Sequence, residues 1–254
     1  MNIAMGKDVV ETVVEWIKES QRIVVLTGEE LSAESGVPDF SSPDLNPHIS
    51  EFRSSREVRA NYWRKMKQIY PLLVKAHPNP AHEALLELEL IGKLDCLITQ
   101  TIDGLHHHAG NSNVVEIYSS VLWVTCTNCG KDYPLDKIIT DMEKGKEMPE
   151  CEECGKDILK PPISFPGQPL PHWEVREAWI RLRQCDLLLV VGANIDAQPV
   201  SSFPVIAREN GAKIVIISQK ESQLDDYADA VIYGKPTQVL PYIVKKVKES
   251  TQVS

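Results

Sequence analysis

Short, mostly apolar runs alternate with amphipathic segments along most of the chain. Strands are predicted at residues 23–26, 96–99, 114–118, 186–191, 213–218 and 229–233, and helices at residues 8–19, 48–75, 81–92, 199–210 and 236–249. The apolar runs are as short as buried parallel strands, and the amphipathic segments place apolar side chains at helical spacing. Strands and helices that alternate in this way predict an α/β fold, with a mostly parallel sheet and helices on both faces.

Three unusual segments directly follow predicted strands. They are residues 28–40, 100–104 and 192–199, and a helix is expected to begin within residues 31–36. Ligands of parallel sheets bind beyond the carboxyl ends of the strands. We therefore expect the functional site where these three segments meet.

The composition narrows the possible partners. The chain has 254 residues, of which 25% are charged, and a formal net charge of −9. This acidic balance argues against broad nucleic-acid binding, which depends on a basic surface. No apolar run approaches the roughly 20 residues of a membrane span, and no basic region followed by an apolar core marks the N-terminus. We therefore expect a cytoplasmic protein with neither a nucleic-acid nor a membrane partner.

Four of the six cysteines form two Cys-x-x-Cys pairs. The pairs are Cys126 with Cys129 and Cys151 with Cys154, and each is followed by glycine. Two such knuckles bring four thiolates to one tetrahedral Zn²⁺, and four protein ligands make the site structural rather than catalytic. Unligated thiols or redox pairs are the alternative interpretation. Residues 121–160, which hold both pairs and a charged stretch, are interpreted as an inserted zinc-binding module.

Several further motifs point to one family. The chain reads TGEELS at 27–32, SGVPDFS at 35–41, PNPAH at 78–82, TQTIDGLHHHAG at 99–110 and LLLVVGANIDAQP at 187–199. In this order, with the cysteine pairs between them, these motifs resemble those of the sirtuins, the NAD-dependent protein deacylases. The resemblance extends from about residue 20 to about residue 245.

The resemblance implies a fold of two parts, and NAD as the cofactor beside structural zinc. A Rossmann-like large domain would comprise residues 1–44, 76–120 and 161–254, and a small domain would combine a helical insert, 45–75, with the zinc module, 121–160. The family positions that contact NAD correspond to Gly28, Ser32, Asp39, Phe40, Gln100, Asp103 and Gly192. Among these, Asp103 would belong to the nicotinamide pocket, and Phe165 would border the acyl-lysine tunnel.

The position of the family's catalytic base carries a different residue. The family motif Glu-x-His-Gly-Ser reads Glu116-Ile117-Tyr118-Ser119-Ser120 in this chain. The resemblance implies that the histidine relays a proton from the NAD ribose hydroxyls, so Tyr118 occupies the catalytic position. A tyrosine pKa near 10 leaves the hydroxyl protonated at pH 7, whereas histidine titrates near 6.5. We expect Tyr118 to donate a hydrogen bond and to be a poor base.

Other positions at the expected site also depart from the family. Glu29 and Glu30 replace Ala and Gly in the turn that approaches the cofactor. A carboxylate ~5 Å from a phosphate costs about 3 kcal/mol at an effective dielectric constant near 20, which is roughly a hundredfold in affinity. Carboxylates that point to solvent would avoid this cost. The remaining departures are Ser41, Thr101, Pro166, Gly167, Ala193, Asn194 and Ser218.

These departures lead to three hypotheses for the function. The main hypothesis is a divergent sirtuin-fold zinc protein whose NAD binding and deacylation are weakened or lost, that is, a pseudoenzyme or a binding subunit. The second is an active NAD-dependent protein deacylase or ADP-ribosyltransferase that uses a base other than histidine. The third is a scaffold whose cleft accepts a protein, a peptide or a cationic ligand. The sequence predicts no oligomeric state.

Two further groups of side chains are given structural roles. The run His106-His107-His108 suggests a metal site, but a scaffold role for His106 with two surface neighbours fits the motif better. Cys96 and Cys185 lie in apolar, strand-like runs, which favours inert core thiols over redox activity.

Overall fold

The computed structural model describes residues 7–38, 40, 42–196 and 198–251. The helices are α1 (Lys7–Glu19), α2 (Glu29–Ser32), α3 (Ile49–Ser54), α4 (Arg56–Lys75), α5 (Pro80–Leu90), α6 (Leu105–Ala109), α7 (Leu135–Glu143), α8 (His172–Leu182), α9 (Phe203–Glu209) and α10 (Pro236–Thr251), with short 3-10 turns at Ala33–Ser35, Val200–Ser202 and Asp225–Tyr227. The strands are β1 (Ile23–Thr27), β2 (Leu94–Thr99), β3 (Val114–Glu116), β4 (Trp123–Cys126), β5 (Asp132–Pro134), β6 (Leu159–Lys160), β7 (Leu187–Val191), β8 (Lys213–Ser218) and β9 (Ala230–Tyr233). Among the described residues, no helix combines the length and the apolarity that a membrane crossing requires.

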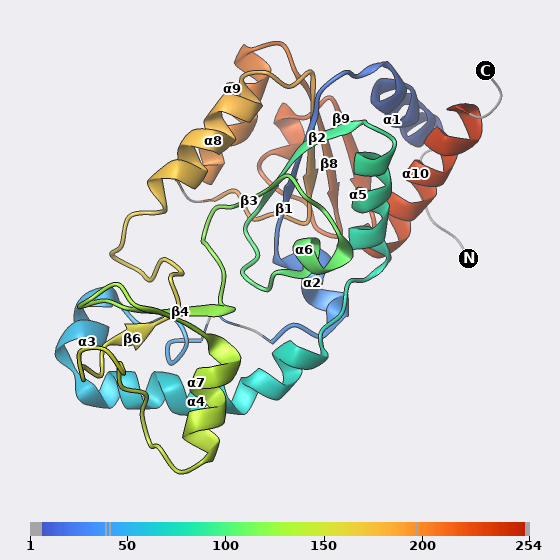
Figure 1. Cartoon of the computed structure of the whole chain (residues 1–254). Helices are drawn as coiled ribbons and strands as arrows, with labels where there is room; N and C mark the ends of the chain where they lie inside the picture. The colour runs from blue at the N-terminus through green and yellow to red at the C-terminus, as the bar shows by residue number, and fades with distance from the viewer. Residues whose placement is uncertain (1–6, 39, 41, 197, 252–254) are drawn as a thin grey trace.

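Six parallel strands form the central sheet, in the order β3-β2-β1-β7-β8-β9 (Figure 1). Thr27, at the end of β1, lies opposite Thr99 of β2 on one side and Val191 of β7 on the other. The chain order of the strands reverses between β1 and β7, which makes the crevice beyond their carboxyl ends the topological switch point of the sheet. The predicted α/β fold with a Rossmann-like parallel sheet is confirmed.

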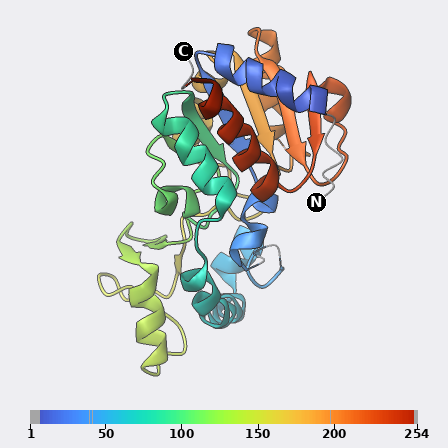
Figure 2. The ribbon, with the colours of Figure 1, turned by 90° about the vertical axis from the view of Figure 1, so that its right-hand side faces the viewer.

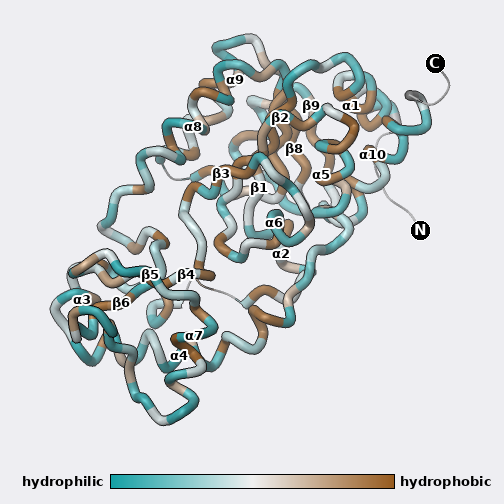
Figure 3. Tube along the Cα trace, in the orientation of Figure 1, coloured by the Kyte–Doolittle hydropathy of each residue, from teal (hydrophilic) through white to brown (hydrophobic). Residues whose placement is uncertain are grey.

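Helices cover both faces of this sheet because successive residues of a strand point to opposite sides. In β1, Ile23 and Val25 pack with α1, α5 and α10, whereas Val24 and Leu26 pack with α8 and α9. Figure 2 shows α1, α5 and α10 together on one face, and Figure 3 shows apolar strands inside the helical layers. All five residues of β1 are buried, which explains why its first four residues are apolar.

A second sheet of three antiparallel strands, in the order β5-β4-β6, lies apart from the first (Figure 1). It packs with α3, α4 and α7 around one apolar cluster that includes Phe52, Trp63 and Ile139. This cluster combines side chains of the predicted helical insert with side chains of the predicted zinc module. Phe165, which follows the zinc module, packs in the same cluster. The domain boundaries themselves stay a prediction.

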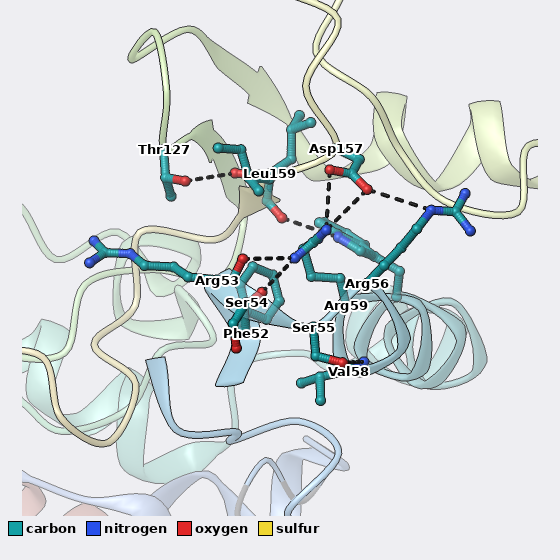
Figure 4. A network of polar contacts seen from close by, with 12 residues as sticks. Phe52, Arg53, Ser54, Ser55, Arg56, Val58, Arg59, Thr127, Asp157 and Leu159 are labelled. Carbon is teal, nitrogen blue, oxygen red and sulfur yellow. Dashed lines mark hydrogen bonds and ion pairs between the residues drawn. The ribbon is translucent and has the colours of Figure 1, made fainter. Parts of the chain in front are cut away.

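Polar contacts also join the helical insert to the zinc module (Figure 4). The guanidinium of Arg59, on α4, donates to the two carboxylate oxygens of Asp157 at 3.1 and 3.3 Å, and to the main-chain oxygen of Phe52 at 2.9 Å. The indole N–H of Trp63 donates to the main-chain oxygen of Leu159 at 3.1 Å. Arg59 is buried, so Asp157 compensates a charge that would otherwise be costly to remove from water.

The structure moves two of the predicted helix boundaries. The helix expected within residues 31–36 begins earlier, at Glu29, and a 3-10 turn follows it up to Gly36, whose φ of +77° ends the helical course. The segment 48–75, predicted as one helix, consists of two helices divided at Ser55, whose hydroxyl accepts an N–H of α4 at 3.3 Å and caps that helix.

Candidate functional site

The candidate site lies at the carboxyl ends of β1, β2, β7 and β8. Gly28, directly after β1, makes a close contact with the end of β7. A Cβ on Gly28 would lie 2.5 Å from Ala193 Cα and from Gly192 O, and 3.0 Å from Gln100 Oε1. Only glycine therefore lets the three strand ends converge. The three segments that were expected to meet do come together at this point.

Tyr118 follows β3 and lies beside Gln100, which follows the neighbouring strand β2. Its half-buried ring packs against the apolar cluster beneath α8 and α9. Burial raises the pKa of the Tyr118 hydroxyl above its ordinary value of 10.0, and a hydrogen bond with the Gln100 side chain acts in the opposite direction. Because the hydroxyl stays protonated at neutral pH, it acts there as a hydrogen-bond donor rather than as a base.

Ser119 has a backbone conformation that favours glycine. Its φ is +66°, and no other non-glycine residue in the described part of the chain has a positive φ. The left-handed region costs an L-residue about 1–2 kcal/mol. The turn after β3 therefore has a backbone shape that suits glycine better than serine.

Asp103 is buried next to the end of β2 and is held by donors on its own loop. Its Oδ1 accepts the Leu105 N–H at 2.9 Å and the Thr101 hydroxyl at 3.4 Å. Burial raises the pKa of Asp103, and the hydrogen bonds from Leu105 and Thr101 partly oppose that shift. Thr101, one of the departures from the family pattern, is itself buried and turned inward to Asp103 and Thr99.

A buried polar network supports the strand ends. The Thr27 hydroxyl donates to Thr99 Oγ1 at 2.9 Å and lies 2.9 Å from His106 Nε2. The rings of His106 and His82 are 4.8 Å apart between centroids. Burial lowers the pKa of both histidines, that of His82 to about 4, so both are neutral at pH 7. These contacts place His106 in the scaffold of the site.

The two glutamates of the first turn have different surroundings. Glu29 is exposed, whereas Glu30 is half-buried. The Glu30 carboxylate accepts hydrogen bonds from the Ser218 hydroxyl at 3.0 Å and from the Gln219 N–H at 2.7 Å. The carboxylate of Glu30 is therefore fixed at the end of β8.

The remaining predicted site residues lie in several environments. Ser32 is buried at the end of α2, and Gly192 turns the chain after β7 with a φ of +56°. Phe165 is buried in the apolar cluster around α3 and α4, and Phe40 packs partly against the same cluster. Asp39 lies outside the described residues. The structure thus brings Gly28, Gln100, Asp103 and Gly192 to the strand ends, and Phe165 to the small sheet.

A cavity of about 350 Å³ opens beside Asp103, between α4, α6 and α7. Its polar lining includes Tyr70, His108 and Asp136. Burial and the charge of Asp136 raise the pKa of the Tyr70 hydroxyl. Sequence reasoning did not select Tyr70 or Asp136, because their elements meet only in the folded chain and neither stands in a recognised motif, whereas His108 was noted as part of the histidine run.

The four cysteines converge as the spacing predicts. Their Sγ atoms all lie within 4.8 Å of one another, with Cys126 and Cys154 3.6 Å apart and Cys129 and Cys151 3.5 Å apart. A tetrahedral Zn²⁺ with Zn–S distances of ~2.3 Å separates its ligands by about 3.8 Å, whereas a disulfide needs about 2 Å. The donor set therefore fits one zinc ion, and the two pairs of sulfurs lie beyond disulfide distance. Among the described residues, no second cluster of this kind is found.

Comparison with known proteins agrees with this geometry. Residues 28–199 match the model of the Sir2 family. An NAD-dependent protein deacetylase of Thermodesulfovibrio yellowstonii is 36% identical over 240 residues, which cover 92% of this chain and 93% of that protein.

Two solved structures extend the comparison. Sir2Af2 bound to a myristoylated histone peptide is 32% identical, with a TM-score of 0.82, and the match covers 98% of this chain and 100% of that one. A Sir2 variant with a histidine changed to tyrosine, in complex with a p53 peptide and NAD, is 31% identical, with a TM-score of 0.83 over 96% of this chain and 99% of that one. With its six-stranded parallel sheet, its four-cysteine cluster and relatives that match along nearly its whole length, this chain belongs to the Sir2 family, the sirtuins.

Proposed function

We propose that the chain is an NAD-dependent protein deacylase in which the step that needs a base is slowed by Tyr118. The observation that carries this proposal is the environment of Tyr118, which lies beside Gln100 with its pKa raised by burial and which, by resemblance, corresponds to the family's histidine. Around it, the convergence of Gly28 with the ends of β2 and β7 keeps the strand-end cradle of a nucleotide site. The proposal therefore favours altered chemistry over loss of cofactor binding.

The residues at the switch point fit NAD. The turn at Gly28 leaves no room for a Cβ, which is the property that permits close main-chain approach to a pyrophosphate. By resemblance, Gly28, Ser32 and Gly192 would hold the phosphate and ribose groups, and Asp103 would hold the nicotinamide end. When bound, NAD would supply the ribose carbon that the acyl oxygen attacks, with nicotinamide as the leaving group. Asp39 and Phe40 remain proposed contacts on the same grounds.

Tyr118 would orient the ribose through a donated hydrogen bond and would not remove its proton. General acid–base catalysis contributes typically 10²- to 10⁴-fold to a rate. We therefore expect binding to be preserved and turnover to be slower by a factor in this range. The complex of a His-to-Tyr Sir2 variant with peptide and NAD supports this expectation by analogy with that protein.

Restoring the motif tests the proposal. In the double variant Tyr118→His/Ser119→Gly, the chain reads Glu-Ile-His-Gly-Ser. Calorimetry measures the binding of NAD and of an acetyl-lysine peptide, and mass spectrometry counts the deacetylated peptide. We expect similar affinities for the wild type and the double variant, and turnover at least about a hundredfold faster in the double variant. Tyr118→Phe is the matched control, because it removes only the hydroxyl.

Failure of both proteins to deacylate any peptide with NAD would overturn the proposal. Wild-type protein that binds NAD and acyl peptide but forms no product in a long single-turnover reaction would support a second candidate, a reader of acylated lysine without catalysis. The raised pKa of Tyr118 is the observation that favours this candidate.

We also propose that the cysteine cluster holds one structural Zn²⁺ and that a small domain comprises residues 45–75 and 121–160. The shared apolar cluster and the contact between Arg59 and Asp157 support this division. An acylated protein or peptide is the proposed occupant of the cleft, with Phe165 at its acyl-lysine tunnel. A cytoplasmic location is also proposed, on the grounds given by the sequence.

A further inference from the structure

Glu30 extends across the end of β7 to the end of β8. Its main-chain N–H donates to Gly192 O at 3.3 Å. Its carboxylate accepts the Gln219 N–H at 2.7 Å and the hydroxyl of Ser218, the last residue of β8, at 3.0 Å. The side chain is thus fixed between two strand ends rather than free in solvent.

Gly192 provides the space for this arrangement. A Cβ on Gly192 would lie 2.8 Å from the Cβ of Glu30, closer than side-chain packing allows, and the φ of +56° independently favours glycine. Gly192 therefore leaves the space that Glu30 occupies, and the fold fixes the Glu30 carboxylate at the end of β8.

Glu30 reaches the edge of the crevice in which parallel sheets of this type bind nucleotides. The sheet order puts the switch point between β1 and β7, and ligands occupy the crevice beyond the carboxyl ends of the strands there. In dinucleotide-binding sheets, an Asp or Glu at a strand end accepts hydrogen bonds from ribose hydroxyls. Here the carboxylate comes from the turn after β1, but it is anchored at a strand end in the same way.

We propose that Glu30 binds the adenosine ribose of the nucleotide and selects nucleotides with a free 2′-hydroxyl. The inference rests on the proposed NAD site. A carboxylate has about four lone-pair sites, and the hydrogen bonds from Ser218 and Gln219 use two of them. The others are available for the two hydroxyls of a ribose, which are donors.

The same carboxylate disfavours a 2′-phosphate. A phosphate on the 2′-oxygen would bring like charges to within ~5 Å, and their repulsion at an effective dielectric constant near 20 corresponds to roughly a hundredfold in affinity. The negative charge that looks unfavourable for a nucleotide in the sequence becomes a specificity element once its position is known.

Equilibrium binding of three nucleotides to the full chain tests the inference. ADP, 2′-deoxy-ADP and 2′-phospho-ADP carry the adenosine ribose and the pyrophosphate but no nicotinamide, so the result does not depend on deacylation. We expect the wild type to bind ADP about tenfold more tightly than 2′-deoxy-ADP and roughly a hundredfold more tightly than 2′-phospho-ADP. Glu30→Gln should lower the affinity for ADP about tenfold and bring the three affinities close together.

Glu29→Gln is the matched control, because it makes the same change of charge at the exposed neighbouring position. It should leave the ratios of the three affinities unchanged, and circular dichroism checks that each variant is folded. Unchanged ratios in Glu30→Gln would overturn the inference. So would tighter ADP binding in Glu30→Gln or Glu30→Gly, which would mean that the carboxylate blocks the site.

The proposed function fails in a different way. If the chain is not a deacylase, the variant Tyr118→His/Ser119→Gly forms no deacetylated product, while the ratios of the affinities for ADP, 2′-deoxy-ADP and 2′-phospho-ADP stay as expected. A wild-type chain that binds none of the three nucleotides would overturn the ribose inference directly.

Discussion

His82 makes the stability of the fold depend on pH in a way that one substitution isolates. The residue is fully buried on α5, where its Nδ1 accepts the Asn79 N–H at 3.2 Å in a capping box. Its Nε2 therefore carries the proton of the neutral ring. Burial lowers the pKa of His82 from 6.5 to about 4. A second proton on this ring would place a charge next to His106, whose pKa is lowered as well.

The sign and the size of the effect follow from this difference in pKa. The contribution of neutral His82 to the free energy of unfolding is complete above pH 6.5, where the ring is neutral in both the folded and the unfolded chain. It is lost as the pH falls towards 4, because the unfolded chain takes up the proton first. One pKa unit corresponds to about 1.4 kcal/mol, so the loss is about 2 kcal/mol at pH 5 and about 3 kcal/mol at pH 4.

The variant His82→Gln removes the titration and keeps an acceptor at the third position of the capping box. Urea unfolding of the wild type and the variant, followed by circular dichroism at pH 7.5, 6 and 5, measures the difference in the free energy of unfolding. We expect the variant to be less stable at pH 7.5 and to gain about 2 kcal/mol relative to the wild type by pH 5.

Leu88→Ala, on the same helix, is the control. It removes buried apolar volume and no titrating group, so its deficit of about 2–5 kcal/mol should be the same at each pH. Parallel stability curves for the wild type and His82→Gln between pH 7.5 and 5 would refute the reasoning, because His82 would then titrate in the folded protein as it does in the unfolded chain.

Three further substitutions test other parts of the structure. Ser119→Gly should raise the free energy of unfolding by about 0.5–1 kcal/mol, because it relieves a φ of +66°, and a fall in the melting temperature would contradict this. Arg59→Met should cost about 2–3 kcal/mol, because it leaves Asp157 without its buried partner, whereas exposed Arg56→Met should cost less than about 0.5 kcal/mol. Equal losses of unfolding free energy in the two variants would show that the pair of Arg59 with Asp157 stabilises the fold no more than an exposed ion pair does. Cys151→Ser should abolish the binding of one zinc per chain, measured by elemental analysis, and unfold the small sheet; unchanged zinc content would reject the site.

The sequence predicts the strands of the large sheet well because each is buried on both faces. A continuous run such as β7, all of whose residues are buried, has no other stable place in a globular chain. The cysteine cluster was equally predictable, since two Cys-x-x-Cys knuckles have few other uses. Helices α6, α7 and α8 were missed. α6 has only five residues, too few to show a pattern. α7 and α8 do carry apolar side chains at helical spacing, so the sequence holds the signal for both: Leu135, Ile138, Ile139 and Met142 in α7, and Val175, Ala178, Trp179 and Leu182 in α8.

Glu30 shows where sequence reasoning about the site reaches its limit. From the sequence, a carboxylate in a nucleotide turn can only be judged by its charge, which predicts repulsion of phosphate. Its effect depends on where the side chain ends, and here that is set by Ser218 and Gln219, which are 188 and 189 residues away along the chain. No local pattern encodes such a pairing. The same carboxylate is unfavourable beside a pyrophosphate and favourable beside a ribose diol. The binding experiment separates these two effects by comparing Glu30→Gln with Glu29→Gln, which makes the same change of charge at the exposed neighbouring residue.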